Sequence, residues 1–394
     1  MSTGIDDIVD AASVGMSAER LGWARDLMAR QVESGRTPSV VAVVLRRGRC
    51  VFAEAMGVQG PHGAPLELDH LWPMASVTKP LTATVAMSMV EDGEIGIHQP
   101  VADYLAELDE PEDAEILIHH LFTHTMGWQS SQFTGRGPTF VAEGRLPPPP
   151  PHRDFATHLF LSMAFDPIRI DPPGVMMRYD NAGYELLAEI VRRLTGGTLD
   201  AQMRTRVFGP LDMADSALIL DDRFAGRVVT RAAGLPFGPD APLALEGELL
   251  ESSDSGAAGA FLTAPDLARF GEMIRRGGAI GDTRILAPST VRSMTTDQIP
   301  GTPADFGGMV IPSASWGYGF TIVQTRPFSY FRGGLVPLGS VLHPGVGGTS
   351  FWIDVEHELV GVWFEVLTQV SDLNEPVSGV GQRFQDIVTA AVVE

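Results

Sequence analysis

Strand-forming sequence lies near both ends of this chain, and mostly helix-forming sequence lies between. Residues 39–45 and 50–55 are rich in apolar and β-branched side chains, and the turn at 47–49 joins them, which predicts a β-hairpin. Residues 316–366 contain further short β-type runs separated by glycine. The simplest assembly of these segments is a single antiparallel sheet built from both ends of the chain.

Amphipathic helices are expected near both termini, where they would flank this sheet. Residues 17–34 and 376–393 carry apolar side chains at helical spacing. We therefore predict a mixed α/β (α+β) fold in which residues 1–95 and 255–394 form a sheet domain and residues 96–254 a mostly helical domain. Shorter helices are expected over residues 76–92, 181–195 and 265–276.

The composition is that of a soluble globular chain and limits its partners. Of the 394 residues, 44% are hydrophobic and 20% charged. The formal net charge is -21, which disfavours nucleic acid and anionic membranes because phosphate binding needs clustered cations. Without a run of 18 apolar residues, no membrane partner is expected. Cys50 is the one cysteine, so no intrachain disulfide can form. Residues 1–10 lack the pattern of a signal peptide, and we expect a cytoplasmic protein.

The use of rare residues singles out one position. The chain has 28 lysines and arginines, and Lys79 is the only lysine among them. Arginine does not deprotonate in proteins, whereas desolvation readily lowers the pKa of lysine. A chain that otherwise uses arginine has kept a lysine here, which suggests that this position needs an amine able to lose its proton.

Ser76 and Lys79 form the first candidate catalytic element. A spacing of three places both side chains on one face of a helix, about one turn apart. Pro80 is tolerated in the first turn of a helix, so the helix should begin near Ala75 or Ser76. A serine hydroxyl is a weak nucleophile until a base removes its proton, and a neutral lysine can do this. The S-x-x-K spacing alone also occurs by chance in many proteins.

Tyr179 and Asn181 form the second element, directly before an expected helix. The Tyr179 phenol could share a proton with Lys79 and protonate a leaving group. The Asn181 amide oxygen could orient Lys79 while its N–H groups face a substrate carbonyl. A turn that begins a helix, which Asp and Asn favour in general, explains the same residues without catalysis.

The third element is the segment His-Pro-Gly-Val-Gly-Gly-Thr at residues 343–349. Its glycines permit close approach to the backbone. The backbone N–H groups of Val346 and Ser76 could form an oxyanion hole, and His343 could contact the substrate or stabilise negative charge. A glycine-rich hairpin is the alternative interpretation.

With these three elements in this order, the chain resembles the superfamily of serine β-lactamases and penicillin-binding proteins. It looks most like the family VIII carboxylesterases, which have a class C β-lactamase fold, and the resemblance covers nearly the whole chain. It implies a β-lactamase/transpeptidase-like fold, with an antiparallel sheet flanked by terminal helices and a mostly helical lobe. Further segments that carry it are Ile97–Leu105, His120–Gly127, Pro173–Gly174, Ala257–Asp266 and Trp316–Gly319.

The resemblance also implies roles for the candidate residues. Ser76 would be the acylated nucleophile, and Lys79 and Tyr179 the base pair. Asn181 would shape the site, and His343 and Gly345 would lie on the third-motif strand. Many members carry a lysine, which engages an anionic carboxylate, where this chain has His343.

Because histidine is mostly uncharged at neutral pH, the substitution of His343 for lysine predicts weak or no β-lactamase activity. It favours a small neutral ester as the substrate of a serine carboxylesterase. Acyl transfer, or amide or peptide cleavage, by the same residues remains the alternative.

Other kinds of site find little support in the sequence. No serine lies in a G-x-S-x-G segment, and the histidines of His119–His124 lack an H-E-x-x-H pattern or cysteine partners. We expect neither a metal nor a cofactor. A non-catalytic binding protein would be expected to have lost Ser76, Lys79 or Tyr179, and all three are present. The sequence leaves the oligomeric state open.

Overall fold

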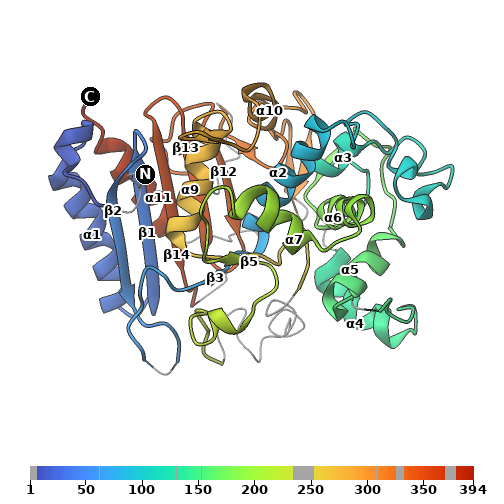
Figure 1. Cartoon of the computed structure of the whole chain (residues 1–394), viewed down its shortest axis with the longest axis horizontal. Helices are drawn as coiled ribbons and strands as arrows, with labels where there is room; N and C mark the ends of the chain where they lie inside the picture. The colour runs from blue at the N-terminus through green and yellow to red at the C-terminus, as the bar shows by residue number, and fades with distance from the viewer. Residues whose placement is uncertain are drawn as a thin grey trace.

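The two ends of the chain meet in one antiparallel sheet of six strands, in the order β11-β12-β13-β14-β1-β2 (Figure 1). The structure is a computed structural model that describes residues 7–61, 63–129, 132–151, 153–233, 253–306, 309–324, 332–368 and 379–394. The expected sheet is therefore confirmed, with the hairpin at its edge. Its strands are β1 (Ser39–Arg46), β2 (Arg49–Gly57), β11 (Thr321–Ile322), β12 (Val341–Gly345), β13 (Thr349–Asp354) and β14 (Leu359–Glu365).

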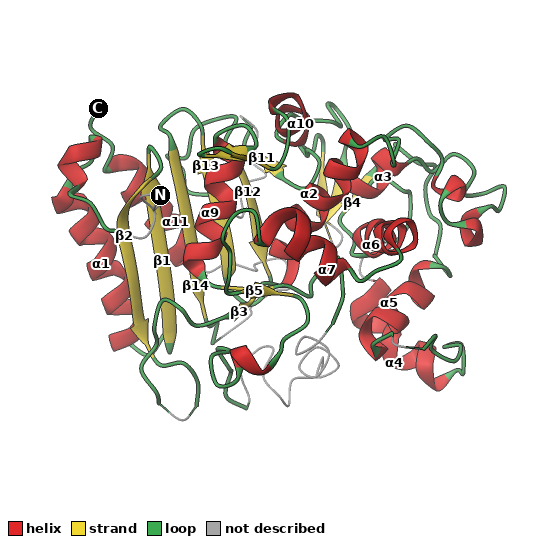
Figure 2. Ribbon diagram, viewed as in Figure 1, coloured by secondary structure: helices red, strands yellow, loops and turns green. Residues whose placement is uncertain are grey.

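Helices cover both faces of this sheet, and β1 is buried along its whole length as a result. Val40 faces a cluster that contains residues of α1 (Ala18–Glu33) and α11 (Gly379–Ala390). Val43 faces the opposite cluster, with residues of α9 (Ala264–Arg275). Figure 2 shows α1 and α11 on the outer side of the sheet and α9 on the other. A strand covered on both faces is expected to be apolar throughout, as β1 is.

A largely helical part lies beside the inner face of the sheet (Figure 1). Its centre is α2, which packs against α6 and is buried over most of its length. The helices outside the sheet layers are α2 (Thr78–Glu91), α3 (Ile118–Thr123), α4 (Gln132–Ala142), α5 (Phe155–Ala164), α6 (Ala182–Thr195), α7 (Leu199–Met203) and α10 (Pro288–Met294). Single turns are η1 (Ala11–Val14), η2 (Ala75–Val77), η3 (Val101–Asp103), η4 (Ala106–Leu108), η6 (Asp222–Phe224) and the π-helical η5 (Arg204–Phe208).

Three small sheets connect these parts. In one of them β3 pairs with β6 and β6 with β5, directly ahead of Ser76. In another, β4 joins β9 and ends just before Tyr179. Their strands are β3 (Trp72–Pro73), β4 (Met177–Arg178), β5 (Ser216–Ala217), β6 (Phe261–Leu262), β7 (Ala279–Ile280), β8 (Thr283–Arg284), β9 (Ala304–Phe306) and β10 (Met309–Ile311).

The predicted helices are found with small shifts in their ends. The helix predicted over 76–92 is divided into the 3-10 turn η2 and the α-helix α2. The first residues of the terminal helix predicted over 376–393 lie outside the described residues. The proposed domain limits at residues 95 and 255 stay a prediction. Among the described residues, no helix combines the length and the apolar character that crossing a bilayer requires.

Candidate active site

Ser76 lies in the turn η2, whose backbone is held by two neighbouring segments. Ala75 has φ +46°, a left-handed conformation that L-residues rarely adopt and that persists only where the surroundings fix it. The Met74 N–H donates to the Ala260 carbonyl at 2.8 Å, and the Met74 carbonyl accepts from Thr349 Oγ1 at 3.0 Å. The position of the Ser76 hydroxyl is therefore set by the chain on both sides of it.

The Lys79 amine is completely buried and has three oxygen neighbours. Its Nζ lies 3.0 Å from Ser76 Oγ, 2.8 Å from Asn181 Oδ1 and 3.0 Å from the Ala257 carbonyl oxygen. The amide and backbone oxygens can only accept, so they occupy two N–H groups of the amine. The third tetrahedral direction faces Ser76 Oγ. In a neutral amine this direction holds the lone pair, which can accept the Ser76 proton.

Burial makes the neutral form of Lys79 accessible. Desolvation lowers the pKa of its amine to about 7, against the smaller opposing effects of the Glu185 and Asp180 carboxyl groups. Burial also raises the pKa of Asp180 to about 7. Near neutral pH, a substantial fraction of the Lys79 amine is therefore unprotonated.

Tyr179 completes this group of side chains. Its ring lies under the Lys79 amine, with Nζ 5.0 Å from the ring centroid. Its phenol is hydrogen-bonded to Ser76, which lowers the phenol pKa, while burial has the larger effect and raises that pKa well above its ordinary value. The Lys79 amine and the Tyr179 phenol thus both contact Ser76, and the proton sharing expected between them stays a prediction.

His124 supports Tyr179 and was not among the predicted site residues. Its ring centroid lies 4.5 Å from that of Tyr179 and 5.1 Å from that of Trp316. Its Nδ1 accepts the Asp180 N–H at 3.2 Å. Burial, followed by the charge of Lys79, lowers the pKa of His124 well below its ordinary value, so its ring is neutral. The signal in the sequence was its position in the segment His120–Gly127.

His343, on β12, faces the site as a neutral side chain. Its ring centroid lies 6.2 Å from that of Tyr179, and its Nδ1 lies 2.8 Å from the Pro344 carbonyl oxygen. Burial and the charge of Lys79 lower the pKa of His343 to about 3. His343 therefore provides no positive charge at the position where the resemblance implies a lysine in many members.

Gly345 ends β12 against the turn that carries Ser76. A Cβ atom at this position would lie 2.3 Å from the Met74 carbonyl oxygen and 2.2 Å from Thr349 Oγ1, so only glycine fits. The close approach expected at this glycine is thus made by the protein's own backbone. Among the hydrogen bonds of the described residues, none is donated by the N–H of Ser76 or of Val346.

The structure thus gathers Ser76, Tyr179 and Asn181 around the Lys79 amine and places Gly345 against the turn that carries Ser76. Sequence reasoning missed the Ala257 carbonyl, which is the third neighbour of the Lys79 amine. The described residues include no group of three or more His, Cys, Asp or Glu side chains placed to hold a metal ion.

Comparison with known proteins relates this arrangement to a family. The family model described as Beta-lactamase matches residues 24–375. Esterase EstB of Burkholderia gladioli is 29% identical over 88% of this chain and 88% of its own length.

Two solved structures share the fold. The crystal structure of a family VIII carboxylesterase has a TM-score of 0.74 at 18% identity, and covers 96% of this chain and 99% of its own. EstCE1, a hydrolase with promiscuous acyltransferase activity, has a TM-score of 0.70 at 20% identity and covers 95% and 98%. The match to the family model spans most of the sequence, and the chain belongs to the beta-lactamase family of serine hydrolases.

Proposed function

We propose that this protein is a serine carboxylesterase that cleaves small acyl esters through an acyl-enzyme on Ser76. The observation that carries the proposal is the buried Lys79 amine, with a pKa of about 7, at 3.0 Å from Ser76 Oγ. A base of that pKa is matched to proton transfer near neutral pH. The similarity to Esterase EstB supports the same choice.

In the proposed acylation step, neutral Lys79 takes the Ser76 proton while Oγ bonds to the ester carbonyl carbon. The carbonyl oxygen becomes an oxyanion, which the N–H groups of Ser76 and Val346 stabilise. The bond to the alcohol then breaks as Tyr179 gives its proton to the leaving oxygen. The proton held by Lys79 restores the phenol, so the acyl-enzyme forms with all protons accounted for.

Deacylation repeats these events with water. Water loses a proton to the Lys79–Tyr179 pair and attacks the acyl carbon. The carboxylic acid leaves and Ser76 recovers its hydrogen. Asn181, bonded to Lys79 through Oδ1, has its amide N–H groups left to meet the substrate carbonyl.

The neutral state of His343 supports an uncharged ester as the substrate class. A lysine at this position would attract a carboxylate, and a buried neutral imidazole does not. For this reason we propose weak or no activity on β-lactams. We also propose a cytoplasmic location, with which a single, buried cysteine that cannot form an intrachain disulfide is compatible.

Acyl transfer to an alcohol is the second candidate. It is favoured by the structural similarity to EstCE1 and uses the same acyl-enzyme. The two functions differ only in whether water or an alcohol attacks the acylated Ser76.

The test compares the purified wild type with Ser76→Ala on p-nitrophenyl acetate and butyrate, with intact-mass analysis of the protein. We expect turnover and an acyl adduct in the wild type and neither in Ser76→Ala. Ser88→Ala, a buried serine further along α2, is the matched control and should retain activity. Equal hydrolysis by wild type and Ser76→Ala would refute the proposal. Added alcohol reveals acyl transfer as a mixed ester, and a chromogenic β-lactam measures the activity expected to be weak.

A further inference from the structure

Glu185, a fully buried carboxyl group on α6, holds the turn that presents the Ala257 carbonyl to Lys79. Its oxygens accept from Ser255 Oγ, from the Gly256 N–H at 3.4 Å and from the Ala257 N–H at 3.3 Å. The carbonyl group of the same residue, Ala257, accepts from Lys79 Nζ at 3.0 Å. Glu185 therefore binds the backbone immediately beside one of the two oxygens that orient the amine.

This turn, residues 255–257, lies between α2 and α6. Thr82 Oγ1 of α2 donates to the Gly256 carbonyl at 2.7 Å. A Cβ atom on Gly256 would lie 2.5 Å from the Tyr184 carbonyl oxygen and 2.6 Å from the Ala188 Cβ of α6. Small displacements of this turn would thus move the Ala257 carbonyl relative to Lys79.

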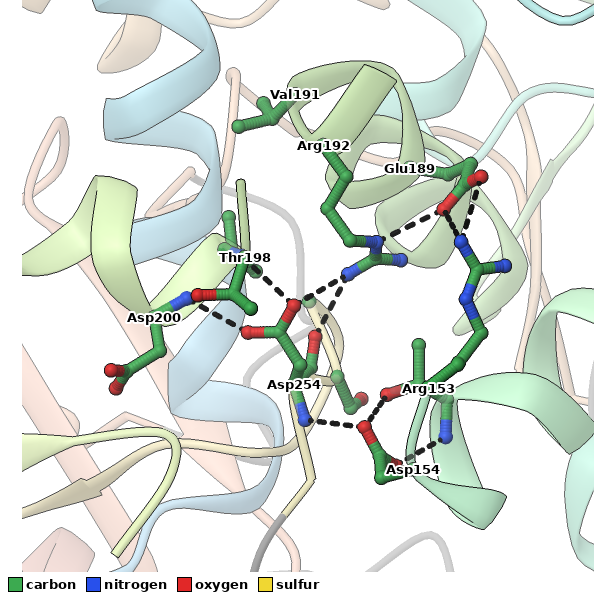
Figure 3. A network of polar contacts seen from close by, with 12 residues as sticks. Arg153, Asp154, Glu189, Val191, Arg192, Thr198, Asp200 and Asp254 are labelled. Atoms are coloured by element: carbon green, nitrogen blue, oxygen red, sulfur yellow. Dashed lines mark hydrogen bonds and ion pairs between the residues drawn. The ribbon is translucent and has the colours of Figure 1, made fainter. Parts of the chain in front are cut away.

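A separate polar network anchors the chain just before the turn (Figure 3). The Asp254 carboxylate accepts the N–H groups of Leu199 at 2.9 Å and Asp200 at 2.8 Å, and Arg192 Nη1 at 3.2 Å. The Asp254 N–H donates to Asp154 Oδ2 at 3.3 Å. Because this network already fixes the course of the segment, the contacts of Glu185 act on the turn itself.

We propose that Glu185 is a positioning residue for Lys79, which acts through the Ala257 carbonyl to keep the free direction of the amine on Ser76. The proposal rests on the function proposed above. Asn181 is the N-cap residue of α6, and Glu185 lies four residues further along, one turn away on the same face. Residues on that face therefore set both acceptors of the amine. Asn181 accepts through its own Oδ1, and Glu185 holds the residue whose carbonyl is the other acceptor, Ala257. If the Ala257 carbonyl moved away, an N–H group of the Lys79 amine could turn toward Ser76. The lone pair of the amine would then no longer face Ser76 Oγ.

Glu185 also acts on Lys79 by its charge. The carboxyl groups of Glu185 and Asp180 both raise the pKa of the Lys79 amine, and that of Glu185 has the larger effect. The other ionisable groups around the amine are His124 and His343, whose lowered pKa values keep them neutral, and the phenols of Tyr179 and Tyr184, whose raised pKa values do the same. Burial raises the pKa of Glu185 itself, against its hydrogen bond from Ser255 and the charge of Arg192. In its ionised form Glu185 raises the pKa of Lys79, so removing that charge should lower the pKa of Lys79.

The test uses Glu185→Gln, with Glu189→Gln as the matched control. Glu189 is buried one turn further along α6, and its carboxylate pairs with Arg153, Arg192 and Arg193. Arg192 links it to the Asp254 network ahead of the turn, whereas the N–H groups of Gly256 and Ala257 donate to Glu185. Because Lys79 is the only lysine, labelling with ¹³Cε-lysine gives one side-chain NMR signal whose titration reports its pKa directly. The second readout is the rate at which a fluorophosphonate modifies Ser76, followed by intact mass at a pH where Lys79 is neutral.

We expect Glu185→Gln to shift the Lys79 titration to lower pH and to slow Ser76 modification at least tenfold at the high-pH plateau. Glu189→Gln should lower thermal stability and leave both readouts as in the wild type. An unchanged plateau rate in folded Glu185→Gln, or an equal loss in Glu189→Gln, overturns the proposal. If Glu185→Gln fails to fold, Ser255→Ala serves in its place and should slow the same plateau. It removes the hydrogen bond to Glu185 and those that Ser255 Oγ accepts from the Ala257 and Ala258 N–H groups. Neither readout needs ester turnover, so a wild type without esterase activity refutes the proposed function and leaves this test intact.

Discussion

Replacing Lys79 by methionine should abolish ester turnover and change the pH dependence of stability in a calculable way. The amine has a pKa of 10.5 in the unfolded chain and about 7 in the folded protein. The unfolded state therefore binds the proton more tightly. The folded state loses stability as the pH falls from 10.5 toward 7, and the loss is constant below that. Methionine does not titrate, so the variant escapes this loss.

The size of the effect follows from the two pKa values of Lys79. The burial of the amine destabilises the wild type by about 4 kcal/mol at pH 7, about 2 kcal/mol at pH 9 and about 1 kcal/mol at pH 10. In the variant, Asn181 Oδ1 and the Ala257 carbonyl oxygen lose their donor. This destabilises the folded state by about 1–3 kcal/mol for each oxygen and does not depend on pH. The net stability of the variant at one pH is therefore uninformative, whereas its change with pH reports the amine together with Asp180, whose pKa of about 7 is lowered by the charge of Lys79.

The assay is urea unfolding of both proteins, followed by tryptophan fluorescence at pH 7, 8, 9 and 10. We expect the unfolding free energy of Lys79→Met relative to the wild type to increase by about 2 kcal/mol between pH 9 and pH 7. A difference that stays flat across this range would show that Lys79 remains an ammonium in the folded protein. It could then not act as the base for Ser76, and the proposed mechanism would fail.

Three further outcomes are expected. In the wild type, kcat/KM should rise about tenfold between pH 6 and pH 8, because the neutral fraction of Lys79 rises through its pKa of about 7, and a stopped-flow pH profile measures this. Tyr179→Phe should lower kcat by about 10²–10⁴-fold and leave the midpoint of that profile in place, since the phenol is the proposed acid for the leaving group. Gly345→Ala should lose at least ~1–3 kcal/mol of stability by calorimetry, because its Cβ would lie 2.3 Å from the Met74 carbonyl oxygen. A fully stable Gly345→Ala protein would contradict the packing described for β12.

The fold was predictable where the sequence pattern extends over several residues. The apolar run of β1 indicated a strand, and Pro80 limited where the helix after Ser76 could begin. The strands β3, β5 and β6 were not predicted, since each is two residues long and too short to show a period of two. The family resemblance supplied the overall architecture that such short elements could not.

The site was predictable where it consists of side chains with distinctive chemistry. The single lysine and its spacing from Ser76 pointed to a serine–lysine pair. The contribution of Ala257 could not be predicted from the sequence, because it is made by a backbone carbonyl and every residue has one. Glu185 was hidden because a glutamate in a helix is ordinarily a solvated charge, and only the tertiary structure shows it buried against Ser255.

The sheet joins strands from opposite ends of the chain, which has a consequence for biosynthesis. β1 pairs with β14, which emerges from the ribosome roughly 300 residues later, about 15–60 s at usual rates of translation. During that interval the β1–β2 hairpin has an unpaired edge, and the apolar face that later meets α11 is uncovered. A nascent chain that stops before Leu359 would keep that edge permanently, so truncated products should be substrates for chaperones and proteases even though Ser76, Lys79 and Tyr179 have already been made.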